Sequence, residues 1–169
     1  MFQFWETKKP YFHVLYQSKE CEKELMNELK QENENFKICF IDGKKCKNVD
    51  NLFHEFSIKL SFPSYFGFNW DAFEECLNDL DWIAADGFLF VIDHCEELLI
   101  NAKEKFELFC DIMKDAAEAW NMGENCSDNL QRKKPFHILF CCSQRREAYS
   151  ILNKTRAIGI EIQLTNKQY

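Results

Sequence analysis

Residues 41–77 read IDGKKCKNVDNLFHEFSIKLSFPSYFGFNWDAFEECL and form the most informative part of the chain. The stretch begins where an apolar run ends, and Asp42-Gly43 is a turn signal directly after that run. Asp50 is expected to cap a helix whose apolar residues recur on one side up to Leu60. A second amphipathic helix is predicted from about residue 68 to residue 80. The local order is therefore a strand, a turn and two helices.

Five short apolar runs along the chain have the length of strands. They lack alternation between apolar and polar residues, as strands buried on both faces of a parallel sheet do. Helical patterns separate or follow them at about 21–29, 50–60, 68–80, 102–120 and 144–153. We therefore predict an α/β fold, a mostly parallel sheet flanked by helices within one domain. The predicted strands lie in residues 11–16, 37–41, 88–92, 136–142 and 160–164.

Composition limits the class of protein. Hydrophobic residues make up 46% of the chain, and 17 Phe stand against 5 Gly and 3 Pro, which excludes disorder and collagen-like repeats. The apolar runs are far shorter than the roughly 20 residues that span a bilayer. The N-terminal MFQFWETKK lacks the pattern of a secretory signal. We expect a soluble cytoplasmic protein with no membrane partner.

The nine cysteines are expected to be free thiols. Their number is odd, no two form a C-x-x-C pair, and most of them lie in apolar runs. Cys141-Cys142 is interpreted as buried strand rather than as a redox centre. His13, His54, His94 and His137 are interpreted as structural histidines.

The acidic charge is local. The chain carries a net charge of −7, but residues 65–118 hold 14 of the 28 acidic residues and only three of the 21 basic ones. That window carries −11 and the remainder +4. Such a balance argues against direct binding of nucleic acid and favours a cationic partner, if the fold gathers the acidic side chains on one face.

The helix predicted at 68–80 divides into two faces. Apolar residues fall on one side of it. Taken alone, the acidic side is most simply a solvated surface. A carboxylate metal site lacks a histidine at ligand spacing, and acid–base catalysis lacks an accompanying nucleophile, so no metal, cofactor or catalytic residue is expected. The polar side carries Asp71, Glu74, Glu75, Asn78 and Asp79.

Residues 41–77 resemble, without gaps, the N-terminal half of barstar, the family of intracellular inhibitors of the ribonuclease barnase. The shared pattern is the strand end at Ile41, the Asp42-Gly43 turn, the helix with Leu52 and His54, and a specific run of residues after it. The later strands and long helix follow the family's order more loosely. The resemblance implies a barstar-like core at 37–142, a strand-helix extension at 1–36 and a helix-strand extension at 143–169. The specific run of residues after the Leu52 helix, which carries most of the resemblance, comprises Leu60, Pro63, Tyr65, Gly67, Asn69, Asp71, Ala72, Cys76 and Leu77.

The resemblance also implies a function. The loop and the acidic helix would fill the active site of a basic ribonuclease, with carboxylates where RNA phosphates bind. Tyr65 would be the loop aromatic, Gly67 the point of backbone approach, Asn69 a polar group at the helix start and Asp71 the first inhibitory carboxylate. A further acidic residue from the long helix would fall near Asp115.

The chain departs from barstar at three of these positions. Glu75 stands where barstar has its most important aspartate, Glu74 stands where it has a tryptophan, and Phe68 replaces a glutamate. These differences point to a nuclease other than barnase. Two alternatives stay open: a barstar-like scaffold that binds another basic protein, and a hydrolase that uses the same carboxylates with a metal ion.

Overall fold

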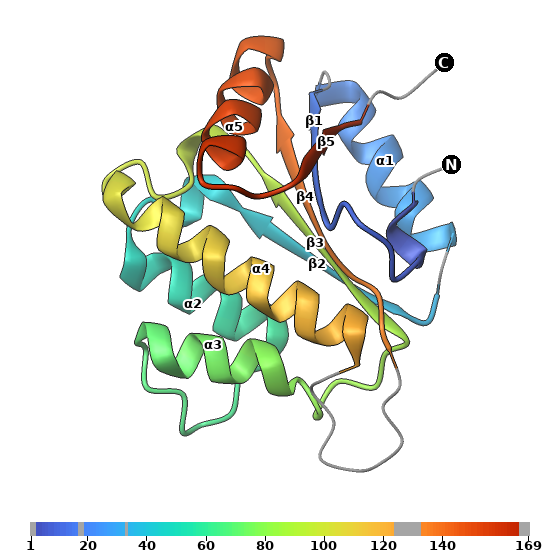
Figure 1. The fold of residues 1–169 in the computed structure, drawn as a ribbon, viewed down its shortest axis with the longest axis vertical. Coiled ribbons are helices and arrows are strands. Elements are labelled where there is room, and N and C mark those ends of the chain that lie inside the picture. The colour runs from blue at the N-terminus through green and yellow to red at the C-terminus, as the bar shows by residue number, and fades with distance from the viewer. Residues whose placement is uncertain (1–2, 17–18, 33, 124–132, 166–169) are drawn as a thin grey trace.

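A computed structural model describes residues 3–16, 19–32, 34–123 and 133–165. Its centre is a five-stranded sheet in the order β2-β3-β4-β1-β5 (Figure 1). Every pairing in it is parallel, which confirms the predicted α/β class, and each predicted apolar run overlaps one strand. The strands are β1 (Phe12–Tyr16), β2 (Phe36–Asp42), β3 (Gly87–Asp93), β4 (Phe136–Cys142) and β5 (Ile162–Leu164).

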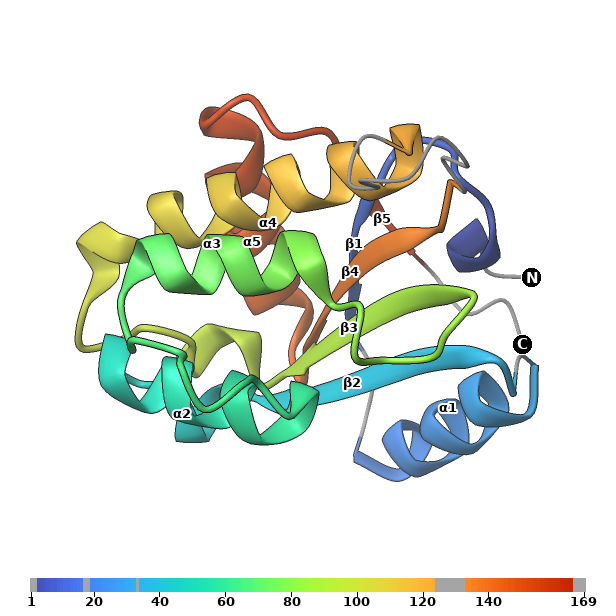
Figure 2. The same ribbon diagram turned by 90° about the horizontal axis from the view of Figure 1, so that it is seen from below.

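Helices cover both faces of the sheet (Figure 2). α1 (Lys19–Glu32) packs on one face through Leu25 and Leu29, against strand residues such as Leu89. Strand residues alternate in direction, so Phe88 and Phe90 face the opposite, larger core. That core is covered by α2 (Val49–Leu60), α3 (Trp70–Asp79), α4 (Phe106–Met122) and α5 (Arg145–Ala157).

The first strand lies inside the sheet rather than at its edge. β1 pairs with β4 on one side and with β5 on the other. The chain crosses from β1 to β2 by way of α1, and returns from β2 to β3 and β4 through helices on the opposite face. Right-handed connections that run in opposite directions across a sheet place their helices on opposite faces. The two helical layers follow from this strand order.

The helices α2 and α4 begin at residues other than those predicted. Asn48 rather than Asp50 caps α2, because the Oδ1 atom of Asn48 accepts a hydrogen bond of 2.9 Å from the Asn51 amide. Asp50 lies in the first turn, where its carboxylate interacts favourably with the helix dipole. α4 begins at Phe106, after a separate 3-10 turn at Lys103–Lys105.

The two buried histidines have hydrogen-bonding partners inside the fold. Nε2 of His13 and Nδ1 of His137 lie 3.1 Å apart, and Nε2 of His137 lies 2.7 Å from the Glu6 carbonyl oxygen. These two histidines are structural, as predicted. His54 is instead exposed on α2, and Nδ1 of His94 lies 2.9 Å from a carboxylate oxygen of Asp93.

The cysteines follow the sequence interpretation. Seven of them have described side chains, and all seven are buried free thiols. Cys21 and Cys126 lie outside the described side chains. Cys141 and Cys142, although adjacent, point into the two different cores. The seven are Cys39, Cys46, Cys76, Cys95, Cys110, Cys141 and Cys142.

Candidate functional site

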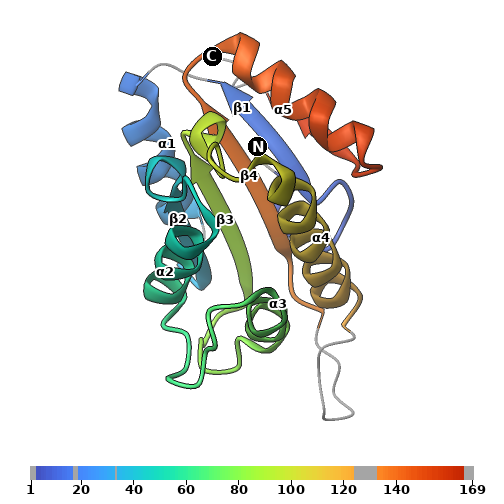
Figure 3. The ribbon, with the colours of Figure 1, turned by 90° about the vertical axis from the view of Figure 1, so that its left-hand side faces the viewer.

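α3 presents an acidic face to solvent. Asp71, Glu74 and Glu75 are exposed, while Phe73 and Leu77 are fully buried against the core. This division is the one predicted from the spacing of apolar residues along the helix. α3 and the loop before it lie together at one end of the molecule (Figure 3).

The start of α3 is tied to the preceding loop by one side chain. Oδ1 of Asn69 accepts a hydrogen bond of 2.9 Å from the Ala72 amide, which caps the helix. Nδ2 of Asn69 donates a hydrogen bond of 3.3 Å to the Gly67 carbonyl oxygen. A Cβ atom at Gly67 would lie 2.9 Å from that same nitrogen. Asn69 therefore holds the loop and the acidic helix in one fixed relation.

Phe68 sets the point at which the helix begins. Its φ angle of 51° is left-handed, so α3 starts at Trp70 rather than near residue 68 as predicted. The conformation costs roughly 1 kcal/mol for a residue with a Cβ atom. The Phe68 ring packs 4.7 Å, centroid to centroid, from both Phe66 and His54, and remains 45% exposed. Phe66 is buried, so the loop rests on the core while Phe68 reaches the surface.

Tyr65 extends the site beyond the helix. Its side chain is 68% exposed. Partial desolvation raises the pKa of its hydroxyl, and the carboxylates of Asp79 and Glu75 raise it further. Tyr65 therefore lies close to the acidic face of α3, and at neutral pH its hydroxyl keeps the proton needed to donate a hydrogen bond.

The acidic face has no compensating charge of its own. Among the residues that the structure describes, no Lys, Arg or His side chain lies within 4.0 Å of the carboxylates of Asp71, Glu74, Glu75 or Asp79. Some acidic residues elsewhere are paired, as Glu118 is with Lys9 at 3.0 Å. The field of the α3 carboxylates is thus available to a cationic partner.

Asp115 lies apart from this group, on α4. α3 and α4 pack together, and Nε1 of Trp120 donates a hydrogen bond of 2.8 Å to the Leu77 carbonyl oxygen. The Asp115 side chain is exposed, but Lys114 lies 3.6 Å away and offsets its charge. The predicted site residues on the loop and α3 are contiguous, whereas Asp115 contributes a separate and partly neutralised carboxylate.

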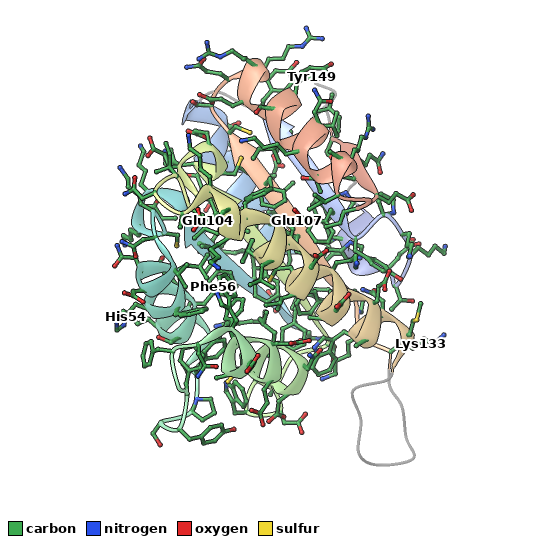
Figure 4. The ribbon with its side chains drawn as sticks, turned by 60° about the vertical axis from the view of Figure 1, so that its left-hand side comes forward. His54, Phe56, Glu104, Glu107, Lys133 and Tyr149 are labelled. Atoms are coloured by element: carbon green, nitrogen blue, oxygen red, sulfur yellow. The ribbon has the colours of Figure 1, made fainter. Side chains whose placement is uncertain are left out.

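The sequence interpretation missed two residues beside the loop. Ile58 on α2 is 71% exposed and lines, with Phe66 and Phe68, a hollow of about 220 Å³. His54 points outward from α2 while Phe56 points inward (Figure 4). The available signal was Ile58 itself, an apolar residue at a position where the helical pattern of α2 expects a polar one.

Comparison with protein families identifies the fold. The family described as barstar (barnase inhibitor) matches residues 36–141. The chain belongs to the barstar family. The matched region runs from the start of β2 to the next-to-last residue of β4 and includes the whole loop and α3. A comparison with curated proteins gives no match.

Solved structures of similar fold are larger proteins. A crystal structure of Cdc6p from Pyrobaculum aerophilum superposes with a TM-score of 0.57 at 17% identity, covering 92% of this chain and 38% of that one. The ORC2 protein of Aeropyrum pernix, solved as ADPNP-ADP complexes, gives a TM-score of 0.54 at 11% identity, covering 91% and 41%. Its ADP form gives 0.52 at 11% identity, covering 94% and 43%. This barstar-family chain thus spans about two fifths of those structures.

At these identities the likeness concerns the fold alone. The sequence holds five glycines, at 43, 67, 87, 123 and 159, and their spacing contains no G-x-x-x-x-G-K-[S/T] phosphate-binding loop. The similarity in fold to structures solved with bound nucleotides is therefore not accompanied by this phosphate-binding motif in the sequence. Among the described residues, no helix is both long and apolar enough to cross a membrane.

Proposed function

We propose that this protein binds a basic ribonuclease and occludes its active site, acting as an inhibitor and not as an enzyme. The observation that carries the proposal is the set of α3 carboxylates, exposed and without internal partners, beside an exposed aromatic loop. Membership of the barstar family supports the same role. Phosphate-binding clefts are lined with Lys, Arg and His, and carboxylates form short charge-assisted hydrogen bonds with such groups.

The arrangement favours fast as well as tight binding. Opposite charges on two proteins steer their encounter, an effect for which the barnase–barstar pair is itself a familiar example. Asp71 near the start of α3 and Glu75 one turn later would enter the cleft, with Glu74 beside them. Gly67 lets the partner's backbone approach the loop, and Tyr65 would cover the rim of the cleft.

Phe68 shapes the choice of partner. It places an exposed apolar ring where barstar carries a glutamate, and the hollow beside Ile58 adjoins it. A partner that matches this surface needs an apolar side chain opposite Phe68 rather than a cation. We therefore expect a ribonuclease related to barnase in its charged cleft but different at its rim.

The direct test is calorimetric binding to a panel of small basic ribonucleases at low and high salt, together with inhibition of RNA cleavage. We expect submicromolar binding to at least one of them, weakened by salt. Asp71→Ala and Glu75→Ala should each cost about 2 kcal/mol or more of binding free energy. Glu104→Ala removes an exposed carboxylate of another segment and should change little.

Two results would contradict the proposal. One is the absence of submicromolar binding to any ribonuclease in the panel. The other is binding that Asp71→Ala and Glu75→Ala leave unchanged. Tight, salt-dependent binding to a basic protein that is no nuclease would instead support the alternative role of the same scaffold. The metal-dependent hydrolase alternative predicts instead that Mg²⁺ or Mn²⁺ saturates a site at Asp71, Glu74 and Glu75, which a titration followed by heat or protein NMR shifts would detect.

A further inference from the structure

Two buried thiols meet at the carboxyl end of the sheet. Sγ of Cys95 and Sγ of Cys142 lie 3.1 Å apart, although the residues are 47 positions apart in sequence. Cys142 is the last residue of β4. The chain leaving β3 turns at His94, whose φ angle is 46°, and enters a 3-10 turn that places Cys95 against the end of the neighbouring strand. The pair is thus fixed by the sheet and by one backbone turn.

A carboxylate completes the group. An oxygen of Glu96 and the two sulfur atoms all lie within 4.8 Å of one another. Oε2 of Glu96 is buried and has no hydrogen-bond partner among the described residues. A buried carboxylate oxygen without a donor is unfavourable, and a cation bound beside it would remove that cost.

We propose that Cys95, Cys142 and Glu96 form a site for a thiophilic divalent cation, with Zn²⁺ as the best fit. Two thiolates and one carboxylate are a donor set that Zn²⁺ accepts, whereas Mg²⁺ and Ca²⁺ take oxygen ligands only. The position differs from the α3 site, which lies at the opposite end of the molecule (Figure 3). The proposal of a metal site and the proposal of ribonuclease binding can therefore be tested independently of each other.

The geometry requires a small adjustment. Zn²⁺ bonded to two sulfurs at about 2.3 Å with tetrahedral angles holds them about 3.8 Å apart. The present separation of the two sulfur atoms is 3.1 Å. Both thiols are protonated in the hydrogen-bonded pair, and a bound cation displaces their protons. The sulfur atoms then need to separate by less than 1 Å, roughly.

A cavity adjoins two of the three proposed ligands. Cys95 and Glu96 form part of the wall of a cavity of about 470 Å³ between the turns that follow β3 and helix α5. Its other walls combine apolar side chains with polar and charged ones, which are Lys103, Glu107, Glu147, Ser150 and Lys154. Three protein ligands with one position open to a cavity are the arrangement that leaves room for water or a small molecule on the metal. A zinc site with a purely structural role would have four protein ligands.

The test is a titration of the reduced, metal-free full-length protein with Co²⁺, a spectroscopic substitute for Zn²⁺. We expect one equivalent to bind, with a thiolate-to-cobalt charge-transfer band that Zn²⁺ abolishes by competition. Cys95→Ser and Cys142→Ser should each weaken binding by at least about a hundredfold and reduce the band, and Glu96→Gln should weaken it by about tenfold or more while the band persists. Cys141→Ser is the matched control, because Cys141 is the neighbouring residue of β4 and faces the other core.

A second measurement covers the case in which the cysteine variants do not fold. X-ray absorption of the Zn²⁺-loaded wild-type protein should show two sulfur ligands at about 2.3 Å. Three results would overturn the proposal: no stoichiometric binding, a zinc site with only nitrogen and oxygen ligands, or a charge-transfer band that both cysteine variants retain. A Cys95–Cys142 disulfide that forms in air, from a reduced protein that takes up no metal, would overturn it as well.

Discussion

The side-chain nitrogen of Asn69 donates a hydrogen bond to the Gly67 carbonyl oxygen, while the side-chain oxygen of the same residue caps α3. One side chain thereby joins the loop to the first turn of the acidic helix. A loop and a helix that enter the same cleft must keep a fixed relation, because loss of order before binding weakens the complex. Asn69 therefore positions the loop relative to α3.

Asn69→Ala should therefore affect both stability and binding. Loss of the cap is expected to reduce the free energy of unfolding by about 1 kcal/mol, measured by urea denaturation. Binding to the partner ribonuclease should weaken in addition, because the loop is released. Asn48→Ala removes the equivalent cap of α2 and serves as the control, with a similar loss of stability and unchanged binding. Equal binding by the two variants would show that the link to Gly67 has no role in recognition.

Gly67→Ala should change binding more than stability. The added Cβ atom would meet Nδ2 of Asn69 at 2.9 Å and displace it from the Gly67 carbonyl oxygen. Gly159→Ala provides the contrast, since Gly159 has a φ angle of 78° with open space around it. That change should cost about 1 kcal/mol of stability and leave binding intact. Gly67→Ala should therefore lower the calorimetric affinity with little change of the urea midpoint. Gly159→Ala should lower the urea midpoint and leave the affinity unchanged.

The buried histidine pair predicts a destabilisation in mild acid. Burial lowers the pKa of His13 from 6.5 to about 3, with a further contribution from His137, and burial also lowers the pKa of His137. The unfolded chain therefore binds protons that the folded chain does not, and stability falls as the pH drops below about 6.5. The loss amounts to at most about 1.4 kcal/mol per pH unit for each histidine.

The measurement is urea denaturation between pH 7 and pH 4, roughly the range over which ordinary histidines titrate. The double variant His13→Leu/His137→Leu should show a shallower decline of stability with falling pH than the wild-type protein. His54→Gln, a change at an exposed histidine, is the control. If the double variant keeps the full slope, other groups are responsible for the acid sensitivity.

Two tryptophan side chains donate hydrogen bonds to carbonyl groups near the C-terminal ends of neighbouring helices. Nε1 of Trp120 donates to the Leu77 carbonyl oxygen in the last turns of α3, and Nε1 of Trp82 donates to the Leu60 carbonyl oxygen at the end of α2. Trp120→Phe should lower stability by about 1–2 kcal/mol, because it leaves a carbonyl group of the helix end unpaired. Hydrogen exchange should also become faster in α3. Trp82→Phe, the matched change, should accelerate exchange in α2 and spare α3.

Much of the fold was predictable because its signals are local. The strands β3 and β4 are continuous apolar runs, and the two faces of α3 follow from helical spacing alone. The start of α3 was not predictable, because it depends on the left-handed conformation of Phe68, which packing against Phe66 and His54 maintains. Propensity assigns that conformation to glycine rather than to phenylalanine.

The residues of the proposed sites also differ in whether they could be predicted from the sequence. The contiguous residues of the loop and α3 could be read from one stretch of sequence, and their role in binding remains a prediction. The Cys95–Cys142 pair could not, because it depends on which strands are neighbours and on the turn at His94. The hollow beside Ile58 was equally hidden, since it needs the tertiary contact between α2 and the loop.

The interior position of β1 has a consequence for how the protein is made. Phe12 of β1 is paired with Ile138 of β4, so the first strand leaves the ribosome long before its neighbours exist. At roughly 5–20 residues per second, β1 waits on the order of ten seconds for β4 to be synthesised. During that time an apolar strand is exposed with both edges unpaired, a state prone to aggregation. Chaperones that shield nascent chains should therefore raise the yield of folded protein more than a faster rate of translation does.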